Sequence, residues 1–297
     1  MSTIFRDAAA RAAIDAAYDR FRARVPGTTS RTVKTRLGDT HVLIGGPADG
    51  PPLVMLHGAL ASAAHLLGEA GPLLDRFRIY AVDVLGQSVK GADVRPDLDG
   101  PAYGEWLVDV LDALSLPRAH VYGVSWGGFV ARKLAEHAPD RIDRLVLMVP
   151  AGFVSGSVWK GMTQLGIPMA LYRAFPSEAR LRRVAQAMFS TMDDVWVPYF
   201  GEALLHYKLD MRIPPLATPE SLAGWKRPTL VFGASSDVSF PGQALIDRAK
   251  ALIPHAEVEL LDCRHSPPTD DAFRAQLGDR VSRFLLAGEA APARARA

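Results

Sequence analysis

One seven-residue stretch, Tyr122–Gly128, constrains the fold most, because it places a serine between glycines at the junction of two structural elements. Its sequence, Tyr-Gly-Val-Ser-Trp-Gly-Gly, contains the pattern Gly-x-Ser-x-Gly. The residues before it, from Arg118, are β-prone. The residues after it, Phe129 to Ala135, predict a helix that Pro139 ends. A strand, a sharp turn and a helix in this order present the serine at the end of the strand.

The turn requires small residues on both sides of Ser125. Gly123 and Gly127 leave room where a Cβ atom would clash in so tight a bend. The helix that follows aims its first N–H groups at any negative charge that develops beside the serine. The stretch therefore predicts an exposed, activated hydroxyl rather than an ordinary glycine-rich turn.

Length and composition indicate one large α/β domain with an inserted subdomain, since the chain has 297 residues. With 34 basic and 32 acidic residues, the net charge of +2 gives no electrostatic reason to expect nucleic acid or an anionic membrane as a partner. No apolar run reaches the roughly 20 residues of a membrane span. The single cysteine, Cys263, excludes an internal disulfide, and we interpret it as a small buried side chain.

Residues 1–27 predict an amphipathic N-terminal helix that packs on the body of the protein. Ile14, Tyr18, Phe21 and Val25 recur at helical spacing, and arginines and aspartates interrupt the apolar residues between them. These charges argue against a signal peptide, so we expect a cytoplasmic protein. The aspartates also disfavour the alternative of a basic helix lying on a membrane.

The rest of the chain alternates between predicted strands and helices. A hairpin with its turn at Gly38-Asp39 is expected to join Thr32–Leu37 to Thr40–Ile44. Further strands are predicted at 53–56, 78–83, 144–149, 228–233 and 257–261, and further helices at 61–76, 103–114, 243–252 and 270–286. Between 151 and 223 no buried strand pattern occurs, and helical segments alternate with proline and glycine.

From about Arg31 to Leu286 the chain resembles the α/β-hydrolase superfamily. The resemblance depends on the Gly-x-Ser-x-Gly elbow, a His57-Gly58 turn after a buried strand, and the order of elements. It implies a mostly parallel central sheet with helices on both faces, formed by residues 28–150 and 224–287, and a helical cap at 151–223. Residues 288–297, rich in Ala, Arg and Pro, predict a disordered tail.

In this superfamily the nucleophile, the acid and the base follow one another along the chain. His265 follows the last strand, where the base is expected, whereas His255 precedes that strand. The triad acid is expected after one of the strands predicted at 144–149 and 228–233, and Asp237 is the only acid close to the end of either. Asp262 lies three residues before His265, so we expect it to brace the loop. The resemblance thus implies a Ser125–Asp237–His265 triad.

The resemblance also assigns an oxyanion hole to the backbone N–H groups of Ala59 and Trp126. His57 is expected to fix the loop before Ala59 and not to act as a base. Asp83, followed by Gly86 and Ser88, is expected to organise a loop, although this chain lacks the second glycine that many relatives carry there.

The first half of the expected cap is rich in apolar and aromatic residues, and we predict that some of them line a substrate pocket. The residues chosen are Phe153, Trp159, Met162 and Tyr172. Ordinary packing between cap and body is the alternative. Five acids of the cap could instead bind a substrate ammonium, or face solvent: Glu178, Asp193, Asp194, Glu202 and Asp210.

The resemblance implies hydrolysis of an ester or related acyl bond in a small, apolar substrate, with no metal or organic cofactor. A serine at the elbow argues against branches of the superfamily that use an aspartate nucleophile. The run Ser-Trp-Gly-Gly also resembles proline iminopeptidases, and carbon–carbon bond hydrolases, thioesterases and acyltransferases share the triad. A ligand-binding protein on the same fold is the non-enzymatic alternative. The natural substrate and the oligomeric state are not predicted.

Overall fold

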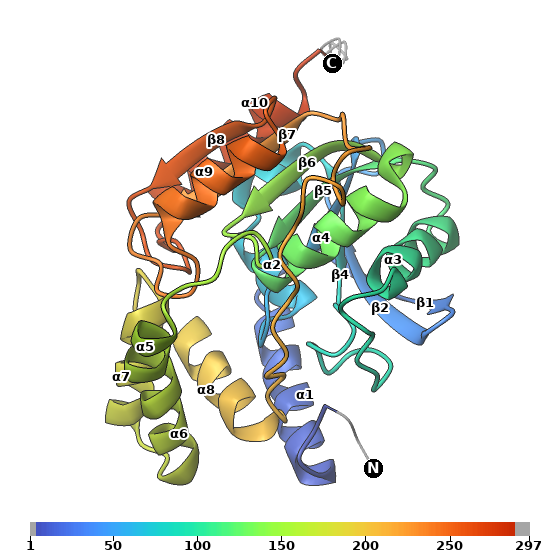
Figure 1. The fold of residues 1–297 in the computed structure, drawn as a ribbon. Helices are drawn as coiled ribbons and strands as arrows, with labels where there is room; N and C mark the ends of the chain where they lie inside the picture. The colour runs from blue at the N-terminus through green and yellow to red at the C-terminus, as the bar shows by residue number, and fades with distance from the viewer. Residues whose placement is uncertain (1–3, 289–297) are drawn as a thin grey trace.

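The computed structural model describes residues 4–288, and within them eight strands form one sheet in the order β1-β2-β4-β3-β5-β6-β7-β8 (Figure 1). Strands β3 to β8 run parallel to one another, whereas β2 is antiparallel to both β1 and β4. This mostly parallel sheet confirms the predicted fold class. The strands are β1 (Thr29–Thr35), β2 (Gly38–Gly45), β3 (Pro52–Leu56), β4 (Arg78–Val82), β5 (Ala119–Val124), β6 (Ile142–Met148), β7 (Thr229–Ala234) and β8 (Glu257–Leu261).

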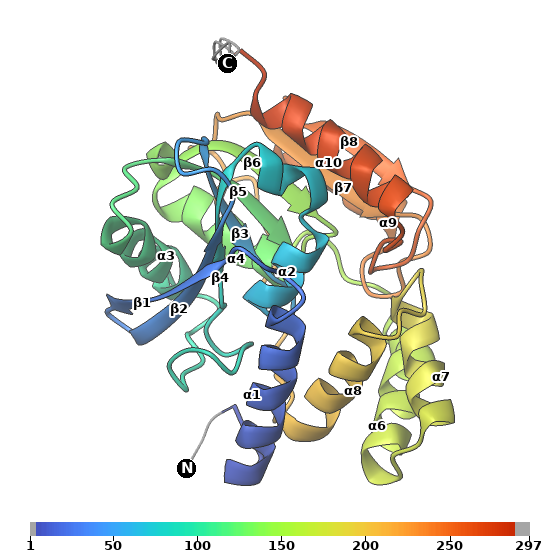
Figure 2. The same ribbon diagram turned by 180° about the vertical axis from the view of Figure 1, so that it is seen from behind.

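Helices cover both faces of the sheet (Figures 1 and 2). Because successive side chains of a strand point to opposite faces, β3 supplies both cores. Val54 and Leu56 pack with one set of helices, and Leu53 and Met55 with the other. The first set is α3 (Ala102–Ala113), α4 (Trp126–His137) and α9 (Gly242–Leu252), and the second is α1 (Ala8–Arg22), α2 (Ala63–Glu69) and α10 (Asp271–Leu285).

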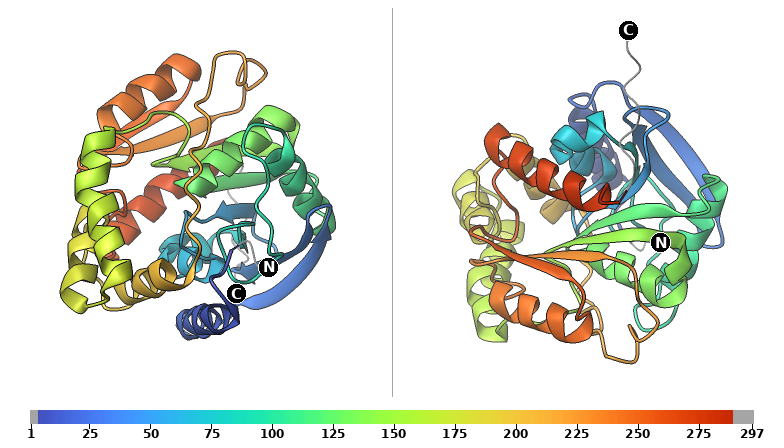
Figure 3. Two further views of the ribbon diagram at one scale, coloured as in Figure 1. Left: turned by 60° about the horizontal axis from the view of Figure 1, so that its bottom comes forward. Right: turned by 90° about the horizontal axis from the view of Figure 1, so that it is seen from above.

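A helical segment, residues 151–223, is inserted between β6 and β7 and lies to one side of the sheet (Figure 3). Helix α8 lies between α1 and the pair formed by α6 and α7 (Figure 1). After α8 the chain is irregular up to β7. Pro214 and Pro215 lie in this irregular stretch and cannot donate helical hydrogen bonds. The helices are α5 (Val158–Gly161), the π-helical turn η3 (Met162–Gly166), α6 (Ile167–Ala174), α7 (Glu178–Met188) and α8 (Trp196–His206).

Two predicted elements differ from the structure. The hairpin pairs Thr35 with Gly38, so its turn is Arg36-Leu37 and not Gly38-Asp39; Gly38, with a φ of +105°, starts the second strand instead. The helix predicted over residues 61–76 is two elements, α2 and the 3-10 helix η1 (Gly71–Asp75). Gly71 at a φ of +47° interrupts the α-helical path between them.

Helix α1 lies within the N-terminal segment 1–27 and packs on the body. Asp7 caps α1 by accepting the N–H of Ala10, and Ile14 and Tyr18 are buried against the core. The predicted tail, residues 288–297, lies outside the described residues apart from Gly288. Among residues 4–288, no helix has both the length and the apolar character needed to cross a membrane.

Candidate active site

Ser125 occupies the sharp turn between β5 and α4, with φ +51° and ψ −112°. A positive φ is strained for a residue with a side chain, and the surrounding glycines make the turn sterically feasible. A Cβ atom on Gly123 would lie 2.5 Å from the carbonyl oxygen of Gly127, and one on Gly127 would lie 2.1 Å from that of Leu56. The structure therefore confirms the predicted strand, turn and helix around Ser125.

Ser125, His265 and Asp237 meet at the carboxyl ends of their strands, where parallel strands bring their loops together. His265 Nε2 lies 3.0 Å from Ser125 Oγ, and His265 Nδ1 lies 2.7 Å from Asp237 Oδ2. The second oxygen of Asp237 accepts the N–H groups of Ser239 at 2.7 Å and Phe240 at 3.1 Å. In this arrangement the Nδ1–H of His265 donates a hydrogen bond to Asp237, which leaves the Nε2 lone pair facing the hydroxyl of Ser125.

The loop after β3 approaches Ser125 closely, and His57 fixes it. A Cβ atom on Gly58 would lie only 3.2 Å from the Cβ atom of Ser125. His57 Nδ1–H donates to the carbonyl of Gly58 at 2.8 Å, and the N–H of Val84 donates to His57 Nε2 at 2.9 Å. Burial lowers the pKa of His57, so the ring is neutral and holds the loop, as the sequence predicted.

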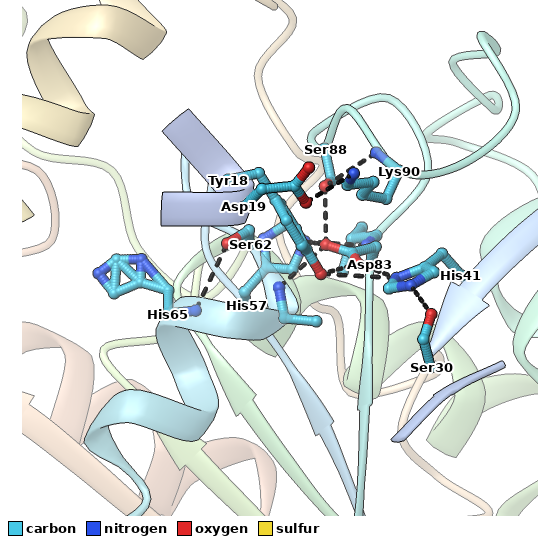
Figure 4. A network of polar contacts seen from close by, with 12 residues as sticks. Tyr18, Asp19, Ser30, His41, His57, Ser62, His65, Asp83, Ser88 and Lys90 are labelled. Atoms are coloured by element: carbon cyan, nitrogen blue, oxygen red, sulfur yellow. Dashed lines mark hydrogen bonds and ion pairs between the residues drawn. The ribbon is translucent and has the colours of Figure 1, made fainter. Parts of the chain in front are cut away.

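Asp83 organises the loops beneath this site (Figure 4). Its Oδ2 accepts the hydroxyl of Tyr18 at 2.8 Å and His41 Nδ1 at 2.6 Å. Its Oδ1 accepts the N–H of Ala63 at 2.9 Å and the hydroxyl of Ser88 at 2.7 Å. Burial opposes ionisation, but the hydrogen bonds, led by that of His41, hold the pKa of Asp83 below its usual value. Asp83 thus joins α1, β2 and α2, which confirms its predicted structural role.

A cavity of about 320 Å³ opens beside Ser125 and His265, and most of its walls are apolar. The face of the sheet below Ser125 contributes Met55, Tyr122 and Met148. Glu69 and Arg274 bring charge to it, with 3.8 Å between their carboxylate and guanidinium atoms. The inserted segment contributes Leu165, Met169, Met188, Phe189, Trp196 and Phe200.

The four residues predicted to line the pocket lie elsewhere. Phe153 is buried on the opposite face of the sheet, in the core that contains α4, and Tyr172 is buried within the inserted segment. Trp159 and Met162 point outward and are exposed. The prediction used apolar composition, which does not tell which face of a helix turns inward.

The five acids of the inserted segment are also absent from the walls of the cavity. Four of them have other partners. Glu178 pairs with Arg182, Glu202 with His206 and Asp210 with Arg212. Asp193 accepts the N–H groups of Val195 and Trp196 where α8 begins, while Asp194 is exposed.

Sequence reasoning missed several residues of the cavity. Trp196 and Phe200 are four residues apart on α8, a spacing that places both side chains on one helix face and could have indicated an inward-facing pair. Glu69 ends α2 and Arg274 lies in α10, far apart in the sequence, and no local pattern relates them.

The eight-stranded sheet and the Ser–His–Asp arrangement define the class of fold: the chain has the α/β-hydrolase fold. Residues 51–180 match the family model described as the alpha/beta hydrolase fold. A similar protein is carboxylesterase YbfK of Bacillus subtilis (strain 168), which is 28% identical over 241 residues, covering 77% of this chain and 78% of that protein.

Two crystal structures from Bacillus subtilis share the fold over nearly the whole chain. Carboxylesterase CesB (YbfK) superposes with a TM-score of 0.80 at 24% identity, covering 94% of this chain and 99% of that one. Naproxen esterase (carboxylesterase NP) superposes with a TM-score of 0.79 at 24% identity, covering 92% and 97% of the two chains. The chain is therefore carboxylesterase-like in sequence and in fold.

Proposed function

We propose that this protein is a serine hydrolase that cleaves carboxylic esters of small, apolar substrates through Ser125, His265 and Asp237. The observation that carries the proposal is the continuous hydrogen-bond chain from Asp237 through His265 to Ser125. A serine hydroxyl is a weak nucleophile near neutral pH, and this chain supplies the base and the acid that activate it. The similar proteins named carboxylesterase support the same reaction class.

The reaction proceeds in two halves through an acyl-enzyme. Ser125 Oγ attacks the ester carbonyl while His265 Nε2 takes its proton, and Asp237 stabilises the resulting imidazolium. The tetrahedral intermediate then collapses, and His265 returns the proton to the departing alcohol. A water molecule, deprotonated by His265, attacks the acyl-enzyme and releases the carboxylic acid, which restores Ser125.

The N–H groups of Ala59 and Trp126 form the oxyanion hole of this mechanism. Trp126 is the first residue of α4, so its N–H has no partner within the helix. The close approach of Gly58 to Ser125 supports a role for the N–H of the neighbouring Ala59. The N-terminal end of α4 adds a favourable dipole beneath the developing negative charge.

The apolar cavity selects the acyl group, and the inserted segment acts as a cap over it. Burying one methylene contributes about 0.8 kcal/mol, which is roughly a fourfold gain in affinity. Because the acids of the cap lie outside the cavity, none of the described cap residues that line it carries a negative charge to pair with a substrate ammonium. Glu69, the acid that the body of the protein contributes to the cavity wall, already faces the guanidinium of Arg274 at 3.8 Å. This arrangement favours an apolar acyl ester over the aminoacyl substrate of an iminopeptidase.

Turnover of p-nitrophenyl butyrate by the wild type and by Ser125→Ala tests the proposal. We expect the variant to lose at least about a thousandfold in kcat, with an unchanged circular dichroism spectrum. Equal rates in both proteins would favour a ligand-binding protein on this fold. Faster cleavage of a prolyl arylamide than of the butyryl ester would favour the aminopeptidase instead.

A further inference from the structure

The outer face of the inserted segment carries a row of large apolar side chains, each about half exposed or more. We call this row the outer stripe: Trp159, Met162, Ile167, Leu171 and Phe175. Trp159 is 73% exposed and Phe175 is 62% exposed. Single exposed apolar residues are common, but five along one continuous helical stretch mark a binding surface.

A π-helical turn keeps the outer stripe in line. The spacing between Met162 and Ile167 is five residues, which would rotate Ile167 away from the row on an α-helix with 3.6 residues per turn. The intervening turn η3, Met162–Gly166, has the i→i+5 pattern, which widens the turn, so Ile167 lies closer to the face of Met162 than it would on a regular α-helix. The inner face of the same stretch lines the cavity with Leu165 and Met169.

Basic side chains flank the outer stripe. Arg180 places its guanidinium 5.7 Å from the ring centre of Phe175 and donates to the carbonyl of that residue. Lys160, next to Trp159, is exposed. The exposed charges of α5 to α7 are four basic and one acidic: Lys160, Arg180, Arg182 and Arg183 against Glu178.

We propose that the outer stripe and its basic flank bind an anionic lipid surface, which seats the cap in the headgroup region. Apolar and aromatic side chains with lysine and arginine beside them are the composition by which helices lie in that region. In a two-fold dimer through the same face, the excess positive charge of each copy would oppose that of the other, which disfavours a second copy as the occupant. Binding would be peripheral, since no helix among the described residues can span a membrane.

Docking of this face would bring lipid within one helix thickness of the cavity. Leu165 and Met169 line the cavity. They lie on the inner side of the helical stretch that carries the outer stripe, and its outer side would face lipid. Apolar esters concentrate in bilayers, so such docking would place the cavity near its substrates. The binding itself does not depend on the proposed ester hydrolysis, because Ser125 takes no part in it.

Co-sedimentation of the full chain with vesicles tests this inference. We expect binding to phosphatidylcholine vesicles that contain phosphatidylglycerol, weaker binding at high salt, and little binding to phosphatidylcholine alone. Trp159→Ser combined with Phe175→Ser should weaken the partitioning by about tenfold or more. Arg180→Glu combined with Arg183→Glu should do the same through charge.

Matched controls lie away from the outer stripe. Leu260→Ser changes an exposed apolar residue of β8, and Arg118→Glu changes an exposed arginine before β5; both should bind vesicles as the wild type does. All variants should hydrolyse p-nitrophenyl butyrate in vesicle-free buffer at the wild-type rate. Hydrolysis without vesicles tests the proposed function and sedimentation tests lipid binding, so the two proposals can fail separately. Wild-type protein that stays in solution, or stripe variants that sediment like the controls, would overturn the inference. A dimer that dissociates in Trp159→Ser would assign the surface to a second copy and overturn it too.

Discussion

Replacing Asp237 by asparagine should disable His265 without disturbing the fold. The Oδ1 atom of Asp237 accepts two backbone N–H groups, from Ser239 and Phe240. An amide NH₂ group at that position would face two donors, so the amide oxygen of the substituted side chain is expected to stay there. The NH₂ group then takes the place of Oδ2, 2.7 Å from His265 Nδ1.

The consequence is a reversed tautomer of His265. An NH₂ donor beside Nδ1 requires that atom to accept, which moves the ring proton to Nε2. Nε2 then points an N–H at the hydroxyl of Ser125, 3.0 Å away, and has no lone pair to receive its proton. The loss in kcat should reach roughly 10⁴-fold, equivalent to about 5.5 kcal/mol in the activation free energy.

Steady-state hydrolysis of p-nitrophenyl butyrate measures this loss, and thermal unfolding checks that the variant is folded. The matched control is Asp262→Asn, since Asp262 accepts only the hydroxyl of Ser235 among described side chains, at 2.9 Å, and should keep near-normal turnover. Normal turnover by Asp237→Asn would refute the reasoning. If Asp262→Asn lost activity instead, the orienting role would belong to Asp262.

Two further predictions concern stability. Gly127→Ala should lower the free energy of unfolding by about 3 kcal/mol, because the added Cβ would lie 2.1 Å from the carbonyl oxygen of Leu56. Gly161→Ala is the control, since the Cβ added there meets nothing within 4 Å. Equal urea midpoints for these two variants would contradict the steric argument. The apolar walls of the cavity raise the pKa of Glu69 to about 7, although 37% of its side chain is exposed there and Arg274 opposes the shift. The folded state therefore holds this proton to a higher pH than the unfolded state and loses stability as the pH rises from about 4.5 to about 7. Glu69→Gln should therefore raise Tm at about pH 8 and leave it nearly unchanged at about pH 4, and a Tm gain of equal size at both values would contradict this.

The meeting of Ser125, Asp237 and His265 could be predicted from the sequence because their placement follows from connectivity. Gly123 and Gly127 define the turn locally, so Ser125 could be placed without knowledge of the tertiary fold. Asp237 and His265 follow two parallel strands, and the ends of parallel strands meet at one edge of the sheet. The order of elements therefore brings these loops to Ser125, as the structure shows.

The walls of the cavity could not be predicted in the same way. The direction of a helical side chain depends on how the helix docks, and composition does not contain that information. The π-helical turn at Met162–Gly166 adds a residue to one turn, so a regular helical period assigns the residues around it to the wrong face. Trp159 and Met162 face outward, whereas Leu165 and Met169, within and after this turn, face the cavity.

The most direct test of the account is covalent labelling with a fluorophosphonate, followed by intact mass measurement and peptide mapping. Ser125 should carry a single adduct in the wild type, because only an activated serine displaces fluoride from phosphorus at a useful rate. Ser125→Ala should remain unlabelled, and His265→Ala should label far more slowly. A wild type that resists the reagent, or an adduct on a peptide that lacks Ser125, would contradict the account.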